Sequence, residues 1–122
     1  MKKILIIEDD SFLQGMEVTE LKKSGFEVSI AVDGKSGLAS VLKDPVDCVL
    51  LDLMLPGEVD GMGVLAGMKK DDNAKKIPVI VFSNMADGDS YKKVMDMGAT
   101  DFVIKSSVTL PELTEKIQKV LK

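Results

Sequence analysis

KILIIEDD, at residues 3–10, is a run of aliphatic side chains that ends on three acidic residues. Two later runs end in the same way, CVLLD at residues 48–52 on Asp52 and FVIK at residues 102–105 on Lys105. A charge embedded in apolar sequence is costly to bury unless another group pairs with it. If the three runs are parallel strands, their charged ends meet at one edge of one sheet. That edge is then a site for a divalent cation and an anion, with Asp52 at its centre.

Strand-like runs alternate with amphipathic segments along the whole chain. The aliphatic and β-branched runs predict five strands, at Lys3–Ile7, Glu27–Ala31, Asp47–Leu51, Ile77–Phe82 and Thr100–Ile104. Apolar residues at helical spacing predict five helices, which contain Phe12–Leu21, Ser36–Leu42, Met62–Met68, Tyr91–Met97 and Leu110–Leu121. We expect Ser24-Gly25 to end the first of these helices and Gly98 to end the fourth.

This alternation predicts an α/β fold in which an open parallel sheet is covered by helices on both faces. Right-handed crossovers leave few arrangements, and the flavodoxin-like, doubly wound strand order 2-1-3-4-5 suits a chain of five strands and five helices. We interpret residues 1–122 as one domain, since no linker, repeat or low-complexity segment interrupts them. In this order the ligand crevice lies between strands 1 and 3, which end at Glu8-Asp9 and Asp52.

The charged composition excludes several classes of function. The chain has a net charge of −4, and all 16 of its basic residues are lysine. Arginine guanidinium groups form bidentate hydrogen bonds with guanine and phosphate, and this chain has none. A negatively charged protein without them is a poor candidate for direct nucleic-acid binding. The absence of histidine excludes histidine metal sites, histidine base catalysis and a phosphohistidine within this chain.

The cysteine count and the hydropathy favour a cytoplasmic protein. Cys48 is the single cysteine, so no internal disulfide can form, and its place within an aliphatic run predicts a buried structural thiol. The apolar run that follows Met1-Lys2-Lys3 meets Glu8 before it is long enough for a secretion signal. No segment approaches the roughly 20 apolar residues of a membrane-spanning helix, and we expect no membrane association.

Three carboxylates that converge on one crevice repel each other, and a cation relieves that repulsion. Mg²⁺ suits such a site because it prefers hard oxygen ligands and is commonly held by one or two carboxylates together with a phosphate. A simpler role is open to Asp10 and Ser11, either of which can cap the first helix. Capping explains Glu8 and Asp9 less well, and it does not explain Asp52.

Two further polar residues are expected at the same edge. Lys105 ends the fifth strand and can bind an anion attached to Asp52, while Ser83 ends the fourth strand and offers a hydroxyl group. Each residue also has a simpler interpretation, Lys105 as a solvated strand end and Ser83 as a cap of the following helix. The convergence of four strand ends favours the shared site.

These residues, taken in order, make the chain resemble a receiver domain of the two-component response-regulator family, of the single-domain, chemotaxis-regulator-like kind. The matching features are the acid pair Glu8-Asp9 after the first strand, LLDLMLPG at residues 50–57, Ser83, and Phe102 before Lys105. One such feature would be weak support. The whole set, at these spacings on a fivefold strand–helix pattern, is highly specific and covers essentially the entire chain.

The resemblance implies a phosphoacceptor rather than an enzyme with an external substrate. It implies that Asp52 takes a phosphoryl group from a phosphohistidine on a sensor histidine kinase or a histidine phosphotransfer protein. It also implies that Asp9, Asp52 and the backbone carbonyl of Met54 ligate Mg²⁺, while Glu8 holds the waters of the ion. The protein would catalyse only its own phosphorylation and dephosphorylation.

The resemblance further implies a conformational switch. Lys105 would pair with the phosphoryl group, and Ser83 would swing inward to donate a hydrogen bond to it. Phe102 would follow by rotating inward, which would remodel the face formed by helix 4, strand 5 and helix 5. Without the resemblance, the sequence alone favours Phe102 as an ordinary core aromatic.

The chain departs from the usual family pattern at several positions around Asp52. Ser106 stands where family members usually carry a proline with a cis peptide bond, and a cis bond before a residue other than proline costs about 2.5–4 kcal/mol. We therefore predict a trans Lys105–Ser106 bond. Asn84 replaces a small residue and is expected to narrow access to the phosphoryl group. The loop at residues 56–61 is one residue longer than the common form.

Met54 and Met85 follow Asp52 and Ser83 by two residues each, at positions where family side chains often govern the access of water. Both side chains are apolar here. We hypothesise that they shield the aspartyl phosphate and slow its hydrolysis.

Two rival interpretations stay open. A nucleotide-binding domain is disfavoured because GKS at residues 34–36 lacks the glycine that a phosphate loop needs at position 29. An aspartyl phosphatase is disfavoured because EDD at residues 8–10 does not fit an Asp-x-Asp motif. The alternative with more support is a receiver-like interaction module that signals without phosphorylation. Asn84 and Ser106 are compatible with this module, whereas the acid pair, Asp52 and Lys105 argue against it.

The sequence suggests where partners bind but does not identify them. We expect the kinase or phosphotransfer protein at helix 1, near Leu13 and Met16, and a downstream protein target at the face around Lys92, Lys93, Phe102 and Glu112. Signalling is expected through protein contacts. Because the chain has no arginine, we expect a monomer.

Overall fold

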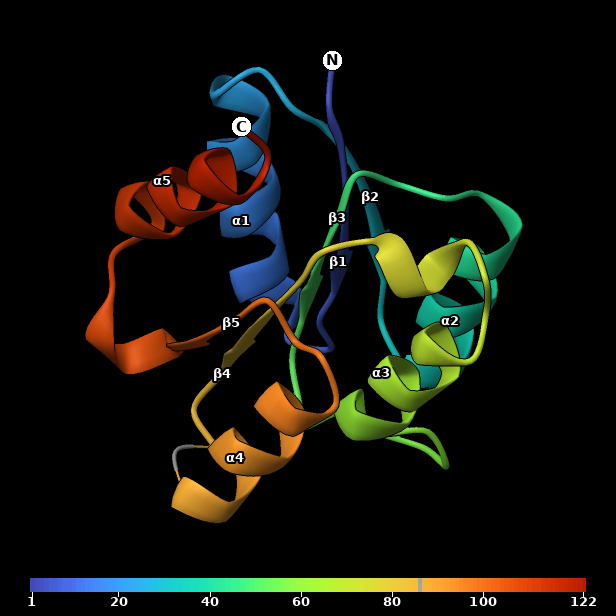
Figure 1. Cartoon of the computed structure of the whole chain (residues 1–122). Coiled ribbons are helices and arrows are strands. Elements are labelled where there is room, and N and C mark those ends of the chain that lie inside the picture. Colours follow the sequence, from blue (N-terminus) through green and yellow to red (C-terminus); the bar gives the residue numbers. More distant parts are fainter. Residues whose placement is uncertain (86) are drawn as a thin grey trace.

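The computed structural model describes residues 1–85 and 87–122, and its centre is a five-stranded parallel sheet (Figure 1). The strands are β1 (Lys3–Ile7), β2 (Glu27–Ala31), β3 (Cys48–Leu51), β4 (Val79–Ser83) and β5 (Asp101–Ile104). Their order across the sheet is β2-β1-β3-β4-β5, and all four pairings are parallel. The predicted α/β class and strand order are confirmed.

Helices cover both faces of this sheet. They are α1 (Ser11–Lys23), α2 (Gly34–Lys43), α3 (Gly61–Lys69), α4 (Gly88–Asp96) and α5 (Leu110–Val120), with short 3₁₀ helices η1 (Ala74–Lys76) and η2 (Lys105–Ser107). In Figure 1, α1 and α5 lie together on one side of the sheet, whereas α2 and α3 lie on the other. Each of the first four strands is followed by a helix that returns the chain to the start of the next strand, and β5 is followed by α5.

Alternate residues of the central strands pack into two separate cores. Ile4 and Ile6 face the core formed with α1 and α5, which also contains Cys48. Leu5 and Ile7 face the core formed with α2, α3 and α4. Because both faces are covered, the central strands are continuous apolar runs rather than alternating ones.

The observed strand ends differ from the predicted ones where the chain chemistry changes. β4 begins at Val79 rather than at Ile77 and extends one residue further, to Ser83. Ile77 instead closes η1, and Pro78 has no N–H to donate to a strand ladder. The predicted starts at Asp47 and Thr100 were each one residue early.

The capping groups explain the helix ends. Asp10, one of the two predicted caps of α1, accepts hydrogen bonds through Oδ1 from the N–H groups of Phe12 and Leu13, at 3.0 and 3.1 Å. α2 begins at Gly34, two residues before the predicted start, because Asp33 caps it. Gly25 (φ 94°) and Gly98 (φ 99°) follow α1 and α4 in the left-handed conformation, as predicted.

The Lys105–Ser106 peptide bond, the Cys48 thiol and the lengths of the helices can also be compared with their predictions. No peptide bond among the described residues is cis, so the trans Lys105–Ser106 bond is confirmed. Cys48 is fully buried, and burial raises the pKa of its thiol to about 12, as expected for a structural cysteine. None of the helices in the described parts of the chain has the length and apolar character needed to span a membrane.

Candidate functional site

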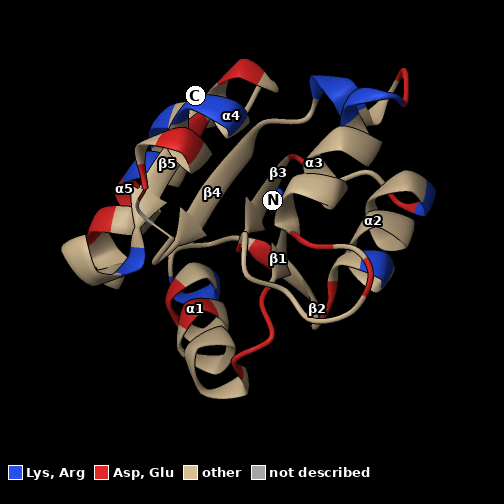
Figure 2. Cartoon of the chain, turned by 90° about the horizontal axis from the view of Figure 1, so that it is seen from below, with Lys and Arg blue, Asp and Glu red and all other residues tan. Residues whose placement is uncertain are grey.

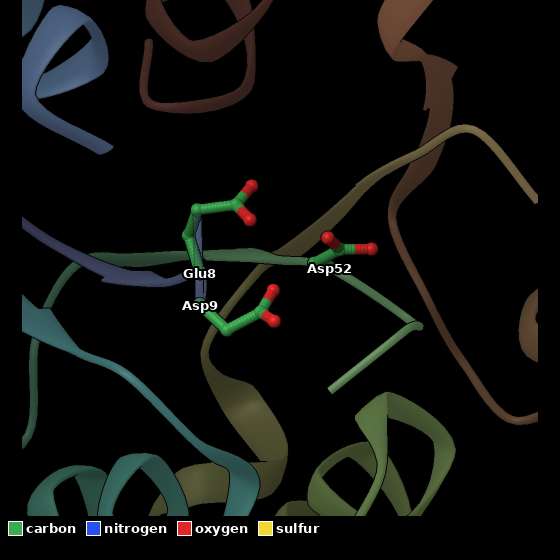
Figure 3. A group of neighbouring side chains, drawn as sticks. All are labelled: Glu8, Asp9 and Asp52. Carbon is green, nitrogen blue, oxygen red and sulfur yellow. The ribbon is translucent and has the colours of Figure 1, made fainter. Parts of the chain in front are cut away.

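The acidic residues predicted to converge do so at the carboxyl edge of the sheet. Glu8 and Asp9 follow β1 and Asp52 follows β3, and ligand oxygens from the three carboxylates lie within 4.8 Å of one another (Figure 3). Figure 2 shows the molecule from this edge, with α1 and α5 on one side and α2 and α3 on the other. Glu8 is 2% exposed and Asp52 is 5% exposed, whereas Asp9 lies in solvent. The cluster therefore combines two buried carboxylates with an open side.

Both oxygens of the Asp52 carboxylate have hydrogen-bonding partners. Oδ1 accepts from the Ser83 hydroxyl at 2.8 Å and from the Met54 N–H at 3.0 Å. Oδ2 accepts from the Lys105 ammonium at 2.7 Å. A buried carboxylate held in this way is orientated and electrically balanced without being sealed from a ligand on its open side.

The Lys105 ammonium also contacts Glu8 Oε1 at 2.6 Å, so it bridges two buried carboxylates. Its side chain is 14% exposed, which excludes the interpretation of Lys105 as a solvated strand end. Burial alone lowers the pKa of Lys105, but the hydrogen bonds to Asp52 and Glu8 outweigh burial and raise it. Lys105 therefore stays charged at neutral pH.

The pKa of the Glu8 carboxyl group is raised despite its ion pair with Lys105. Burial raises the pKa of Glu8, and the nearby charge of Asp52 adds to this, although Lys105 and the N–H of Asp10 lower it. The Asp10 N–H donates to Glu8 Oε2 at 3.1 Å, and Gln14 Nε2 donates to the Glu8 carbonyl at 3.0 Å. The first turns of α1 thus hold the end of β1 in place.

The backbone around Asp52 is fixed by its neighbours. The Asp52 N–H donates to the carbonyl of Ile7 at 3.1 Å, which continues the β1–β3 ladder by one step. Gly61, at the start of α3, lies so close that a Cβ atom there would clash with the Asp52 carbonyl oxygen. Only glycine fits this approach without a shift of the backbone, so the loop after β3 returns directly beneath the acid.

Ser83 belongs to the site and does not cap α4. The cap of α4 is Asp87, whose carboxylate accepts from the N–H of Ser90. The hydroxyl of Ser83 is buried, faces Asp52, and accepts a hydrogen bond from the Met85 N–H at 3.3 Å. The expected inward swing starts from a hydroxyl that faces away, whereas here the hydroxyl already faces Asp52.

Phe102 lies on β5, half-buried at the border between core and surface. Its ring centroid lies 5.6 Å from that of Tyr91 on α4, with an angle of 53° between the ring planes. Tyr91 is more than half exposed. Phe102 therefore contacts both the core beneath α4 and the surface that α4 and β5 share.

The sequence interpretation missed two features near this edge. Glu17 on α1 is 1% exposed, and its Oε1 has no hydrogen-bond partner among the described residues. Burial, with the charge of Glu8 second, raises the pKa of Glu17 to about 8. The i, i+3, i+7 spacing of Gln14, Glu17 and Leu21 would have placed all three on one buried stripe.

The second missed feature is a hydrogen bond between two loops. Oδ1 of Asn84 accepts from the backbone N–H of Ser106 at 3.0 Å. Asn84 is exposed, and its amide is engaged with Ser106 rather than with Asp52. The two residues had been singled out separately, and nothing in the sequence joins them.

The donor set at this edge suits a small, hard divalent cation. Glu8, Asp9 and Asp52 supply only oxygen atoms, and the exposed Asp9 leaves room for the waters that Mg²⁺ retains. The buried Lys105 compensates part of the negative charge from the opposite side.

Comparison with protein families and curated proteins gives one consistent result. The family model described as the response regulator receiver domain matches residues 4–118. Response regulator ArlR of Staphylococcus saprophyticus is 35% identical over 124 residues, covering 100% of this chain and 53% of ArlR. The DNA-binding dual master transcriptional regulator RpaA of Synechocystis is 31% identical over 122 residues, covering 100% of this chain and 50% of RpaA. The chain spans about half the length of these curated relatives.

Solved structures with the same fold cover nearly the whole chain. A response regulator receiver domain protein (CheY-like) from Methanospirillum hungatei gives a TM-score of 0.91 at 27% identity, over 99% of this chain and 94% of that chain. A response regulator receiver domain protein from Clostridium thermocellum gives a TM-score of 0.88 at 28% identity, over 99% and 94% of the two chains.

Proposed function

The chain belongs to the response regulator receiver domain family of two-component signalling proteins, and we propose on that premise that Asp52 accepts a phosphoryl group. The observation that carries this proposal is the setting of Asp52. Its buried carboxylate contacts the Lys105 ammonium and the Ser83 hydroxyl, and two further acids stand beside it. The donor is a phosphohistidine on a sensor histidine kinase or a histidine phosphotransfer protein.

In the proposed reaction, an Asp52 carboxylate oxygen attacks phosphorus as the bond from phosphorus to the donor imidazole nitrogen breaks. The electron pair of that bond returns to the imidazole nitrogen, which takes a proton from water. Lys105, now on Asp52 Oδ2, pairs with the phosphoryl oxygens, and Ser83 donates its hydrogen bond to one of them. These residues contribute positioning and charge neutralisation, which is most of what phosphoryl transfer requires.

We propose that Glu8, Asp9 and Asp52, with the backbone carbonyl of Met54, form the Mg²⁺ site. Asp9, Asp52 and the Met54 carbonyl serve as direct ligands, and Glu8 holds water. When bound, Mg²⁺ neutralises charge on the phosphoryl group. The protein is a signalling protein rather than a classical enzyme, and the only reactions that we propose for it are its own phosphorylation and dephosphorylation.

We propose that phosphorylation changes the face made by α4, β5 and α5, which binds a downstream protein target. Phe102 couples the site to this face, since it lies three residues before Lys105, the first residue of η2, and contacts Tyr91 on α4. Exposed Lys92 and Lys93 on α4, with Glu112 on α5, give the face its charge. The phosphoryl group biases an equilibrium between two packings of Phe102.

The proposed docking site for the phosphodonor is α1. A surface hollow of about 550 Å³ lies along this helix, lined by Phe12, Met16 and Leu110 among other residues. Phe12 is 79% exposed, and α1 begins two residues after the acid pair. A helical partner that covers this apolar surface would bring its phosphohistidine to the open side of Asp52.

We propose a cytoplasmic, monomeric receiver whose only cysteine stays reduced, and whose own surface contacts proteins rather than nucleic acid. The name of RpaA describes a DNA-binding regulator, and this chain matches about half of that protein.

The lifetime of the phosphate is proposed to depend on Met54 and Met85. Met85 is half-buried beside the site, and its sulfur accepts a hydrogen bond from the Ser90 hydroxyl at 3.2 Å. Met54 is 58% exposed, so its side chain must fold over Asp52 in order to shield it. Faster decay of the phosphoprotein after Met54→Asn or Met85→Glu would support shielding, and unchanged decay in both would contradict it.

The decisive test is the incubation of the purified protein with Mg²⁺ and a small-molecule phosphodonor. Acid-labile phosphate is expected on Asp52 and should be absent from Asp52→Asn. Asp72→Asn, which changes an aspartate with a 96% exposed side chain, is the matched control and should label normally. No labelling, or labelling that survives Asp52→Asn, would instead favour an interaction module that signals without phosphorylation.

A further inference from the structure

The loops that follow β4 and β5 are joined by a hydrogen bond from one side chain. The last paired residues of these strands are Ser83 and Ile104, and beyond them the strand ladder ends. Asn84 then turns its side chain towards the next loop, where Oδ1 accepts from the Ser106 N–H at 3.0 Å. The side-chain amide thus continues the connection between the two strands after their backbone pairing has stopped.

This hydrogen bond closes a ring of contacts around Asp52. Ser83 and Lys105 hold opposite oxygens of the Asp52 carboxylate, at 2.8 and 2.7 Å. The residue after each of them, Asn84 and Ser106, completes the ring on the far side. A change in the spacing of the two loops therefore changes the separation of the hydroxyl and the ammonium group at the carboxylate.

We infer that Asn84 and Ser106 form a clamp that positions Ser83 and Lys105 for the reaction at Asp52. This inference rests on the proposed phosphorylation of Asp52 and adds to it a pair of positioning residues that do not touch the carboxylate. The clamp acts on the rate of phosphoryl transfer by keeping both groups in reach of the phosphoryl oxygens. Misplacement of catalytic groups by small distances is costly in such reactions.

The chemistry of the donor explains why these two residues belong together. Ser106 lies in the first turn of η2, where a backbone N–H has no acceptor within the helix. Asn84 supplies that acceptor from outside. A proline at position 106 has no N–H to donate, so the clamp requires a residue other than proline there. Two of the positions at which the chain departs from its family pattern are thus linked by one physical contact.

A double-mutant cycle tests the clamp. Asn84→Ala removes the acceptor. Ser106→Pro removes the N–H donor and also fixes the φ angle of residue 106. We expect each change to slow phosphorylation of Asp52 by a small-molecule donor about threefold to tenfold, the range expected for one neutral hydrogen bond. We also expect Asn84→Ala to have no effect in the Ser106→Pro background, because the bond is already absent there.

Ser106→Ala is the matched control, since it removes the hydroxyl but keeps the N–H, and its rate should equal that of the unmodified chain. The clamp is refuted if Ser106→Ala slows the reaction as much as Ser106→Pro does, or if the effects of Asn84→Ala and Ser106→Pro simply multiply.

A second readout separates failure of the clamp from failure of the proposed function. By NMR, Asn84→Ala should speed hydrogen exchange at the Ser106 amide and shift the Lys105 Cε signal, whereas Ser106→Ala should leave the Lys105 signal in place. If the unmodified chain is never phosphorylated, the proposed function fails and these two signals still judge the clamp. If the chain is phosphorylated normally, Asn84→Ala and Ser106→Pro leave the rate unchanged, and Asn84→Ala leaves both signals unchanged, the clamp alone fails.

Discussion

Glu8 and Glu17 are buried glutamates on the same side of the sheet, and the molecule accommodates them in opposite ways. Glu8, at the end of β1, contacts the Lys105 ammonium at 2.6 Å and accepts a hydrogen bond from the Asp10 N–H. Glu17, on α1, is buried equally well, yet its Oε1 has no partner among the described residues. One carboxylate is paired with a neighbouring cation, and the other is kept buried by taking up a proton.

The difference shows what each position is suited to do. A buried charge is tolerated when an opposite charge and hydrogen bonds replace water, as they do around Glu8. Glu17 has no such replacement, and burial raises its pKa to about 8, so it is mostly neutral at neutral pH. We therefore expect Glu8 to matter for phosphoryl chemistry and Glu17 to matter for the pH dependence of stability.

The largest expected effect comes from removing the cation that makes Glu8 and Asp52 compatible. Lys105→Met should slow phosphorylation at least about a hundredfold, because it removes a preorganised charge at the reacting carboxylate. It should also lower the free energy of unfolding at neutral pH by about 3 kcal/mol, since two buried carboxylates lose their partner. That loss should shrink at low pH, where Glu8, whose pKa is raised by burial, takes up a proton.

Phosphorylation kinetics and denaturant unfolding of Lys105→Met measure these two effects. Lys116→Met is the matched control, because Lys116 is exposed and lies 4.0 Å from Asp101 at the surface. Its stability should change by less than about 1 kcal/mol. Equal behaviour of the two variants would show that Glu8 does not depend on its ion pair and would remove the contrast with Glu17.

Glu17 itself should make the stability of the protein depend on pH. A group whose pKa is raised in the folded state stabilises the protein below its unfolded pKa, and this contribution is lost as pH rises through the folded pKa. For Glu17 the window runs from about 4.5 to about 8. Within it, the stability of the unmodified chain should fall relative to Glu17→Gln by about 1.4 kcal/mol per pH unit.

Denaturant unfolding of both proteins across this pH range measures the difference. The subtraction matters because Glu8, Lys105, Asp52 and Asp10 also act on Glu17 and are common to both proteins. Glu20→Gln removes a carboxylate from the same helix and should run parallel to the unmodified chain. If the Glu17→Gln curve also runs parallel, Glu17 is not held neutral by burial.

The sequence predicted Glu8 but not Glu17, and the reason is physical. Residues at the ends of parallel strands are brought together by topology alone, so the order of the strands was enough to place Glu8, Asp52 and Lys105 at one edge. The face that a helix buries depends on how it packs. Glu17 has helical spacing from Leu21, but a glutamate on a surface helix is usually solvated.

The other differences between prediction and structure have the same physical origin. The orientation of Ser83 was not predictable, because a hydroxyl after a strand can face a helix end or a neighbouring strand. The Asn84–Ser106 contact joins residues 22 positions apart in the sequence, and only the loop conformations bring them together. Strand ends and helix caps are local, whereas contacts between loops depend on the completed fold.

The smallest expected effect comes from Gln14, the other buried polar residue of α1 beside Glu17. Its side-chain Nε2 donates to the Glu8 carbonyl at 3.0 Å, so the buried amide group has a neutral hydrogen-bond partner. Gln14→Leu should destabilise the protein by about 1 kcal/mol and weaken Mg²⁺ binding about twofold to fivefold, a factor that corresponds to part of one hydrogen bond.

Titration calorimetry with Mg²⁺ and denaturant unfolding measure these effects, and Thr19→Ala is the control, because its hydroxyl donates to the Gly15 carbonyl within α1. Among the described residues, the Gln14 side chain donates to the Glu8 carbonyl, so the variant acts on Glu8. Loss of the Gln14 amide should therefore affect metal binding while the pH dependence assigned to Glu17 stays unchanged. If Gln14→Leu instead altered that pH dependence and left Mg²⁺ binding intact, the buried carboxyl groups of Glu8 and Glu17 would be energetically coupled rather than independent.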